Sequence, residues 1–429
     1  MKTLNRKLLR ELWTMKGQAL AIALVIASGI ATFVMSLSTL DSLRHTQGTY
    51  YRDYRFAEVF LSLKRAPESL KERIAEIPGV EKVATRVKAV VTIDISGFND
   101  PVTGHLISIP DEGEPLLNSL YLRKGRLVEA GHDNEVVVSD AFARAHGFLP
   151  GDKLRVTING RRKALTIVGI ALTPEYIYQI QPGSMLPDFK RYGILWMGRP
   201  PLATAYDMEG AFNDVALTLT PQAEIDDVID GLDDLMKPYG GLGAYARKDQ
   251  LSNRFLSEEF RQLGKMATIF PVIFLGVSAF LLNVFVSRFV NTQREIIAVL
   301  KAFGYGNLTI GIHYLKLVLC IVLAGTAGGL LAGIWFGQGL SNMYMDFYRF
   351  PFMEYVLRPY VVVAAIIVSS LAAMAGTIFS LRRAALLPPA EAMRPEPPVS
   401  YRETIIERLG LKGFFTQPGR MIMRHIERR

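Results

Sequence analysis

Cysteine and histidine are scarce in this chain of 429 residues. The one cysteine, Cys320, cannot form a disulfide within the chain, so no disulfide framework supports the fold. The six histidines are scattered, and no pair of them has the spacing of metal ligands. We therefore expect no metal site.

The chain also lacks the short motifs of common enzymes and nucleotide-binding proteins. It has no Gly-x-x-x-x-Gly-Lys-Ser/Thr loop to hold phosphates, no His-Glu-x-x-His and no Gly-x-Ser-x-Gly. Neighbouring carboxylates such as Asp226 and Asp227 lie on a predicted helix, where a solvated face explains them. We expect no catalytic residue, no enzymatic activity and no cofactor bound by this chain.

Charge is missing from the cores of four apolar runs, each long enough for the roughly 20 residues that cross a bilayer. The runs cover residues 19–37, 266–286, 312–337 and 360–379. Charged residues inside spans often mark ion or proton paths, so their absence here disfavours a proton-coupled carrier. Asn283 is the main polar exception. The sequence predicts an α-helical membrane protein with four transmembrane helices.

The net charge of +9 comes from basic residues beside these runs, not from a nucleic-acid-binding face. They precede the first run, lie between the second and third, and follow the fourth, as Lys16, Arg294 and Arg382 illustrate. The positive-inside rule makes these segments cytoplasmic. Both termini are then cytoplasmic and the large segment after the first run is exterior. We expect contacts with membrane lipids and none with nucleic acid.

These patterns divide the chain into nine segments. In chain order they are a cytoplasmic amphipathic helix (1–17), the first span (18–40), an exterior domain with stalk helices (41–264), the second span (265–287), a cytoplasmic loop (288–311), the third span (312–338), an exterior loop (339–358), the fourth span (359–381) and a cytoplasmic tail (382–429).

The exterior domain is predicted to be α+β. Residues 57–63 alternate like a strand, 67–77 are helical, and 80–95 form one or two strands, which gives a βαβ-like unit. A second strand and helix at 214–236 indicate a split α+β domain. The insertion, at about 120–169, is expected to be a small β-rich barrel or sandwich with a hairpin at Asn159-Gly160. Helical patterns beside the first two spans predict paired stalk helices, with two ordinary soluble helices as the alternative.

The third span carries glycines four residues apart, at Gly325, Gly329, Gly333 and Gly337. Such a stripe lets another helix approach closely, so we predict that these are helix-packing residues. We expect Gly329→Leu to impair assembly of a dimer or pair. The following loop is rich in Tyr and Phe, which fits an interfacial aromatic belt or, alternatively, a lateral opening for a lipid-like substrate.

Residues 293–304 form a short mixed-charge segment between two spans. Apolar residues recur at helical spacing, polar residues lie off that stripe, and Gly304 ends the pattern. This predicts a helix of about three turns on the membrane surface, which either connects two spans passively or receives a push from a partner.

This segment, Gln-Arg-Glu-Ile-Ile-Ala-Val-Leu-Lys-Ala-Phe-Gly, resembles the RE-I-x-x-LKA-x-G segment of the FtsX/MacB-like ABC transporter permeases. Residues 381–394 resemble the A-x-P-A-E-A-L-R ending of that family, with Met393 in place of the usual Leu. Pro78-Gly79-Val80 resembles the start of its periplasmic core domain. The layout of one span, a large exterior domain and three spans is also similar.

The resemblance implies a permease subunit of an ABC transporter in a bacterial inner membrane. ATP and Mg would bind a separate ATPase dimer, and a second permease half or another copy of this chain would complete the complex. Movement of the exterior domain, with a porter-like part and a β-rich insertion, would export or extract a hydrophobic or lipid-like substrate. A periplasmic adaptor is a further candidate partner. The alternatives are an FtsX-like signal transmitter that activates an envelope enzyme, and a membrane sensor or scaffold without an ATPase.

The resemblance also implies which residues couple the chain to the ATPase. Polar residues would set the register and apolar residues would fill a groove on the partner. The implied set is Arg294, Glu295, Ile296, Ile297, Leu300, Lys301, Phe303 and Gly304.

The end of the chain repeats a pattern from its start. Residues 420–426 echo residues 6–12, with Arg420 and Arg424 in the places of Arg6 and Arg10. We hypothesise that the chain is the first half of a duplicated permease. A basic cytoplasmic tail is the alternative.

Overall fold

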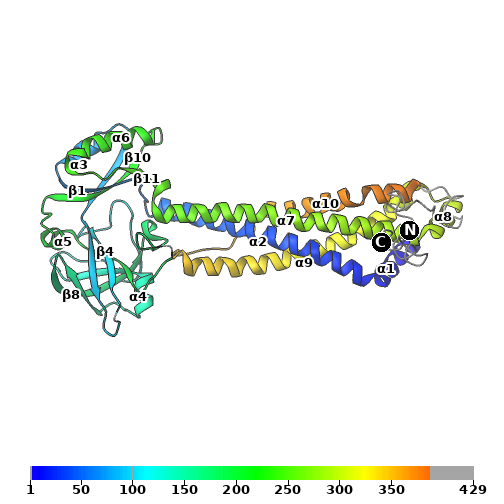
Figure 1. Cartoon of the computed structure of the whole chain (residues 1–429), viewed down its shortest axis with the longest axis horizontal. Helices are drawn as coiled ribbons and strands as arrows, with labels where there is room; N and C mark the ends of the chain where they lie inside the picture. The colour runs from blue at the N-terminus through cyan, green and yellow to red at the C-terminus, as the bar shows by residue number, and fades with distance from the viewer. Residues whose placement is uncertain (1, 99, 185, 387–429) are drawn as a thin grey trace, which may run out of the picture. The chain divides into compact units, whose positions relative to one another are not determined.

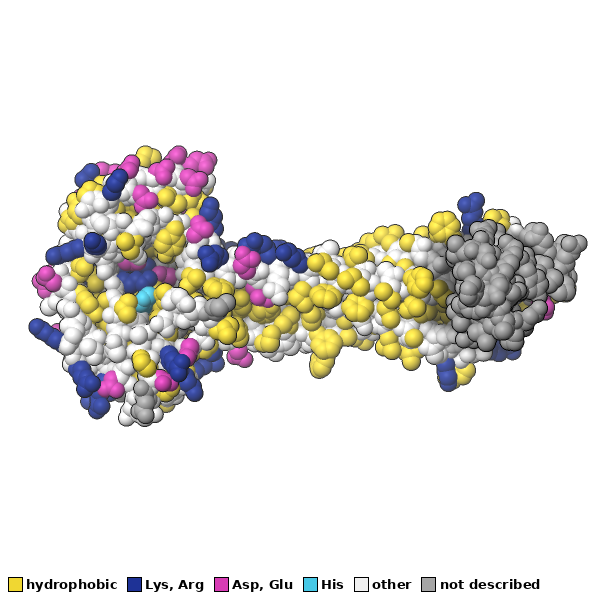
Figure 2. Space-filling view, viewed as in Figure 1, with side chains coloured by type: hydrophobic (Ala, Val, Ile, Leu, Met, Phe, Trp, Pro, Cys, Tyr) yellow, Lys and Arg dark blue, Asp and Glu magenta, His cyan; other side chains and the backbone are white. Residues whose placement is uncertain are grey.

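The computed structural model describes residues 2–98, 100–184 and 186–386 (Figure 1). Within them, four helices are long and apolar enough to cross a membrane, as predicted. They are α2 (Lys16–Asp53), α7 (Leu251–Thr292), α9 (Asn307–Phe347) and α10 (Pro359–Leu386). Hydrophobic side chains gather on these long helices, whereas charged side chains are frequent on the domain between α2 and α7 (Figure 2). We call residues 54–250 the large domain.

The chain divides into two compact units. The first comprises Met1–Ile22, Ser278–Ile321 and Ala372–Arg429, and the second comprises Ala23–Val277 and Val322–Leu371. The large domain lies wholly within the second unit. The first unit also contains two shorter helices, α1 (Lys2–Thr14) and α8 (Arg294–Ala302). The tail beyond residue 386, with the repeated pattern behind the duplication hypothesis, lies outside the described residues.

The predicted stalk consists of continuations of two spans. The helix α2 runs past the predicted end of its span to Asp53, and α7 begins at Leu251, before its own span. Buried side chains from both helices join one apolar cluster, and the Tyr51 hydroxyl donates a hydrogen bond of 2.9 Å to Asn253 Oδ1. The two helices therefore pack together beside the large domain.

The first sheet of the large domain forms the split βαβ fold predicted for it. The strand order is β11-β1-β10-β2, and β10 is antiparallel to both β1 and β2, so these two strands are parallel and separated by β10. The helices α3 and α6 cover one face (Figure 1), where Ile74, Val228 and Leu232 are fully buried. The elements are β1 (Val59–Pro67), α3 (Leu70–Ala75), β2 (Val80–Arg86), β10 (Ala211–Leu219), α6 (Ile225–Met236), η2 (Lys237–Tyr239), β11 (Tyr245–Ala246) and η3 (Arg247–Asp249).

The second sheet is the predicted β-rich insertion. Its order is β5-β8-β6-β9-β4-β3-β7, and an additional pairing of β7 with β8 closes six of the strands into a barrel. At the predicted hairpin, Asn159 and Gly160 have φ angles of 45° and 75°, which a two-residue turn of this type requires. The elements are β3 (Lys88–Asp94), β4 (Val102–Ile109), β5 (Tyr121–Gly125), β6 (Glu135–Ser139), α4 (Asp140–His146), β7 (Lys153–Ile158), β8 (Arg161–Leu172), η1 (Pro174–Tyr176), β9 (Tyr192–Gly198) and α5 (Arg199–Ala205).

The predicted limits of this insertion, 120–169, were wrong, because the second sheet begins at Lys88 and ends at Gly198. The apolar run at 80–95 belongs to two sheets, and the chain changes sheets at Val87, whose backbone N–H donates to Ser108 Oγ at 2.8 Å. Strand β9 is buried along its whole length, so it lacks the alternation that marks a half-exposed strand.

The predicted exterior loop after the third span is partly helical, since α9 continues to Phe347. Three of the six aromatic residues of this segment, Tyr344, Tyr348 and Phe350, are buried. Their cluster includes Tyr178 of the large domain, and the rings of Tyr178 and Tyr348 lie 5.3 Å apart. These three residues therefore form neither an aromatic belt nor a lateral opening. They pack the end of α9 against the large domain.

Candidate functional site

A short amphipathic helix, α8, lies between α7 and α9. It has nine residues, with Gln293 at its N-cap and Phe303 at its C-cap. Glu295 in the first turn and Lys301 in the last turn complement the helix dipole. Gly304 ends the helix with a φ of +88°, a left-handed conformation that glycine adopts without strain, and its N–H donates to Lys301 O at 2.9 Å.

The helix presents one apolar face to its surroundings and buries another. Ile297 and Ala298 are fully buried, whereas Ile296, Val299 and Phe303 are 43%, 47% and 78% exposed. We call these last three residues the exposed face of α8. A contiguous apolar surface of this kind on a short helix suits insertion into a groove of a partner.

The implied coupling residues therefore divide into different environments. Glu295 is exposed, and Leu300 is half-buried. Arg294 and Lys301 already interact with other groups of the chain. Ile297 is fully buried within the chain itself, whereas Val299 is 47% exposed. The coupling role implied for Ile297 stays a prediction, and only the tertiary contacts distinguish Ile297 from Val299.

The first unit contains a contact between Glu11 of α1 and His313 of α9 that no local sequence pattern indicates. The carboxylate of Glu11 lies 3.5 Å from His313 Nε2 and 3.4 Å from Lys7 Nζ. Glu11 and His313 are both buried. The two residues are far apart in the chain, so only the fold could reveal the pair.

The glycine stripe of α9 is filled by the chain itself. Added Cβ atoms on Gly325, Gly329 and Gly333 would collide with α2, and one on Gly337 would collide with Tyr355. For the first three glycines, the nearest atoms, each 2.7 Å from the added Cβ, are Ala23 O, Ile30 Cβ and Val34 Cβ. The stripe thus lets α9 approach α2 of the same chain, so Gly329→Leu should affect this chain's own packing before any pairing.

Asn283, the main polar residue within the predicted spans, joins the parts of α7 and α10 that belong to the first unit. Ser380 Oγ donates to Asn283 Oδ1 at 2.6 Å, and Ser287 Oγ lies 2.7 Å from Ser380 Oγ. Among the described residues, no cluster of three His, Cys, Asp or Glu side chains could hold a metal ion. The Asn283 contact is a hydrogen-bonded link between α7 and α10.

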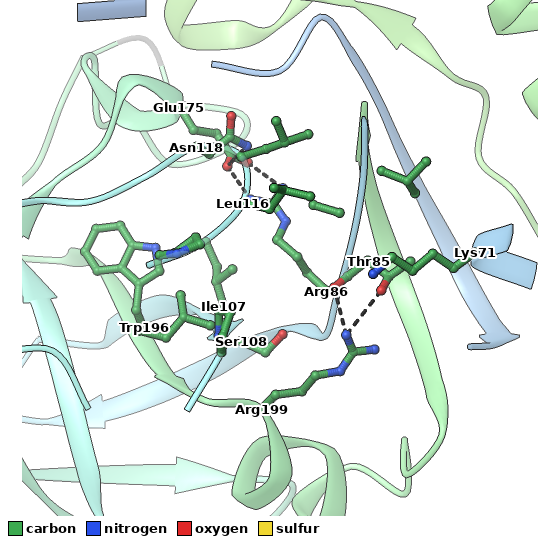
Figure 3. Close-up of a pocket in the computed structure, with 16 residues that line it drawn as sticks. Lys71, Thr85, Arg86, Ile107, Ser108, Leu116, Asn118, Glu175, Trp196 and Arg199 are labelled. Atoms are coloured by element: carbon green, nitrogen blue, oxygen red, sulfur yellow. Dashed lines mark hydrogen bonds and ion pairs between the residues drawn. The ribbon is translucent and has the colours of Figure 1, made fainter. Parts of the chain in front are cut away.

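The two sheets of the large domain meet around Arg86, the last residue of β2 (Figure 3). Its guanidinium lies 2.6 Å from Glu175 Oε2 and 2.6 Å from Asp214 Oδ1, and all three side chains are almost fully buried. Asn118 Nδ2 donates to Glu175 Oε2 at 2.9 Å. Burial raises the pKa of Glu175, but the charges of Arg86 and Lys88 and the hydrogen bonds from Arg86 and Asn118 outweigh it and hold that pKa below its usual value.

A short segment connects this network to the stalk. The carbonyl of Glu175 accepts a hydrogen bond of 2.7 Å from Gln250 Nε2, beside the start of α7. Two residues later, the Tyr178 N–H donates to Ser252 Oγ at 2.7 Å, and the Tyr178 ring lies 4.6 Å from that of Phe255. The segment from Glu175 to Tyr178 therefore contacts both the junction of the two sheets and the first turns of α7.

Four helices long and apolar enough to cross a membrane, a short helix with an exposed apolar face between two of them, and a large α+β domain define an α-helical membrane protein. Residues 13–235 match the MacB-like periplasmic core domain family, and residues 268–389 match the FtsX-like permease C-terminal family. Since the first match alone covers more than half of the chain, this protein belongs to the FtsX/MacB-like ABC transporter permease family.

Several solved structures are similar to part of this chain. The extracellular domain of the noncanonic ABC-type transporter YknZ from Gram-positive bacteria is 11% identical over 44% of this chain and 98% of its own, with a TM-score of 0.30. The periplasmic region of MacB from Actinobacillus actinomycetemcomitans is 10% identical over 49% and 95%, with a TM-score of 0.30. A domain of a putative permease protein from Porphyromonas gingivalis is 15% identical over 47% and 96%, with a TM-score of 0.28. No curated protein matches the chain.

Proposed function

We propose that this chain is the permease subunit of an ABC transporter in a bacterial inner membrane. Both termini and α8 would face the cytoplasm, and the large domain would lie on the opposite side. A separate ATPase dimer would hydrolyse ATP and bind the exposed face of α8. A second permease half or a second copy of this chain would complete the complex. The resulting movement would export or extract a hydrophobic or lipid-like substrate.

The observation that carries this proposal is the exposed face of α8. Ile296, Val299 and Phe303 remain in contact with solvent on a helix placed directly between two spans. Burying the exposed parts of three such side chains in a partner would contribute on the order of 3 kcal/mol. A docked helix of this kind transmits force because α7 ends only two residues before Arg294.

The other end of α7 offers a route for that force into the large domain. Leu251 begins the helix beside Gln250 and Ser252, which hydrogen-bond to the segment from Glu175 to Tyr178. A shift of α7 would therefore pull on the segment that also holds Arg86. This would couple ATP hydrolysis to the junction between the two sheets.

Copurification tests the proposal. We expect the wild-type chain to bring down an ABC ATPase, and Val299→Asp with Phe303→Asp to lose it, because charge on the exposed face opposes burial. Leu242→Asp is the matched control, since Leu242 is 76% exposed on the large domain and its substitution should leave the ATPase bound. Equal ATPase recovery with the double variant, or no ATPase with the wild type, would refute the proposal.

The second candidate function is an FtsX-like signal transmitter, in which the large domain activates an envelope enzyme and no substrate moves. The contacts of the segment from Glu175 to Tyr178 favour it, because they link the stalk to the large domain. Stimulation of the bound ATPase by lipids, lipoproteins or hydrophobic peptides would support transport. Stimulation only by an envelope enzyme would support signalling.

A further inference from the structure

A cavity of about 220 Å³ lies beside Arg86, between the two sheets of the large domain (Figure 3). The first sheet contributes β2 and the neighbouring helix α3, and the second contributes β4, β9 and α5. Pockets for drug-sized ligands usually have roughly 300–1,000 Å³. At about 220 Å³ this cavity lies below that range, so it would hold a molecule smaller than a drug or one end of a longer amphiphile.

One side of the cavity is apolar. Trp196, Ile107 and Leu117 line it and are almost completely buried, so this wall is preformed. Leu116 also lines the cavity and is 43% exposed, which places an apolar side chain where the cavity meets solvent. An aryl or short alkyl group would be desolvated against these side chains.

The charged residues of the cavity leave one cation without a counter-ion. Arg86 is paired with Glu175 and Asp214, and Arg199 Nη2 lies 2.5 Å from Glu68 Oε2. The side-chain ammonium of Lys71, unlike its backbone N–H, forms no ion pair or hydrogen bond with another described residue. Glu175 is the one carboxylate among the lining residues, and it is already engaged by Arg86 and Asn118.

A further hydrogen-bond donor faces the same cavity. Ser108 Oγ accepts the hydrogen bond from the Val87 N–H, which leaves the hydroxyl proton of Ser108 to donate elsewhere. Ser108 lines the cavity in Figure 3, on the strand that also carries Ile107. An anion would thus meet an ammonium group and a hydroxyl donor, with no unpaired carboxylate to repel it.

We propose that this cavity binds a small amphipathic carboxylate. Its apolar group would contact Trp196 and Leu116, and its carboxylate would pair with Lys71 and accept a hydrogen bond from Ser108. The ligand would touch both halves of the large domain at once, because Lys71 lies on α3, which covers the first sheet, and Trp196 and Ser108 belong to the second sheet. This binding site does not depend on the proposed ATPase partner.

The fluorescence of Trp196 provides the test. The full chain is reconstituted in lipid nanodiscs with Trp13→Phe and Trp335→Phe, so that Trp196 is the remaining tryptophan of three. It is titrated with 4-phenylbutyrate and, separately, with the neutral 4-phenylbutyramide. We expect a saturable signal with the acid and binding at least about tenfold weaker with the amide, since a charged hydrogen bond is lost.

Variants separate the cavity from nonspecific binding. Lys71→Ala should weaken the binding of 4-phenylbutyrate about tenfold, and Lys71→Arg should retain most of the wild-type affinity. Lys82→Ala is the matched control, because Lys82 lies on β2 outside the cavity and pairs with Glu81, and it should leave the affinity unchanged. Equal binding of acid and amide, an unchanged affinity in Lys71→Ala, or no saturable signal would overturn the proposal.

Discussion

Replacing Gly329 by alanine tests how closely α9 approaches α2. The added Cβ would lie 2.7 Å from Ile30 Cβ and 2.8 Å from Ala27 O. Ordinary contacts between carbon atoms are roughly 3.5–4.0 Å, so the helices must separate by about 1 Å or Ile30 must leave its position. Overpacking of this kind usually costs about 1–3 kcal/mol, and Gly329→Leu should cost more.

The neighbouring glycine supplies the control. A Cβ on Gly328 would meet only Ala27 Cβ, at 3.9 Å, which is an ordinary contact. We expect the midpoint of thermal unfolding of the purified protein in detergent to fall by several degrees for Gly329→Ala and to change little for Gly328→Ala. Adding Ile30→Ala to Gly329→Ala should recover little of the loss, because alanine keeps the Cβ that lies 2.7 Å away and Ala27 O remains at 2.8 Å. Equal midpoints for the two glycine variants would refute the close contact.

Three further predictions concern buried charges. Arg86→Met should destabilise the large domain by about 3–5 kcal/mol in denaturant unfolding, because Glu175 and Asp214 lose their cation. A variant that also carries Glu175→Gln and Asp214→Asn should recover much of that lost stability. The pKa of Glu175 is held below its usual value, so the ionised carboxylate should contribute fully to the free energy of unfolding above the unfolded-state pKa of about 4.3. That contribution should be lost as the pH falls through the lower folded-state pKa. The stability of the wild type should therefore fall more steeply with acid than that of Glu175→Gln. Glu11→Gln should speed hydrogen exchange in α1, whereas Glu295→Gln, at an exposed carboxylate, should leave that exchange unchanged.

The membrane spans were predictable from sequence because few structures other than a span bury a long uncharged run. The stalk was also predictable, since helical spacing continues past the span in α2 and precedes it in α7. The extent of α9 was not, because the helix continues to Phe347, where Tyr344 and Tyr348 join an apolar cluster with residues of the large domain. Tertiary packing decided that boundary.

The split βαβ sheet was predicted correctly, but the limits of the inserted barrel were not. Alternation marks each strand without stating its partner, so the run at 80–95 gave no sign that the chain changes sheets at Val87. Strand β9 is buried on both faces and therefore carries no alternation. Pairing between distant strands set those limits.

The candidate site was predictable to the level of a helix. Periodicity and Gly304 located α8, but Ile297 and Val299 have similar chemistry, and the fold alone buries the first and exposes the second. The network of Arg86 with Glu175 and Asp214 had no local signal, because its members come from segments far apart in the chain.

Site-specific photo-cross-linking in cells would show whether an ATPase binds the exposed face of α8. A benzoylphenylalanine at position 303 should cross-link to an ABC ATPase, while the same group at position 242 of the large domain should not. At position 297, which is buried, it should cross-link only within the chain. Cross-links from position 303 to lipid alone, or to the ATPase from position 242 instead, would refute binding of an ATPase at the exposed face of α8.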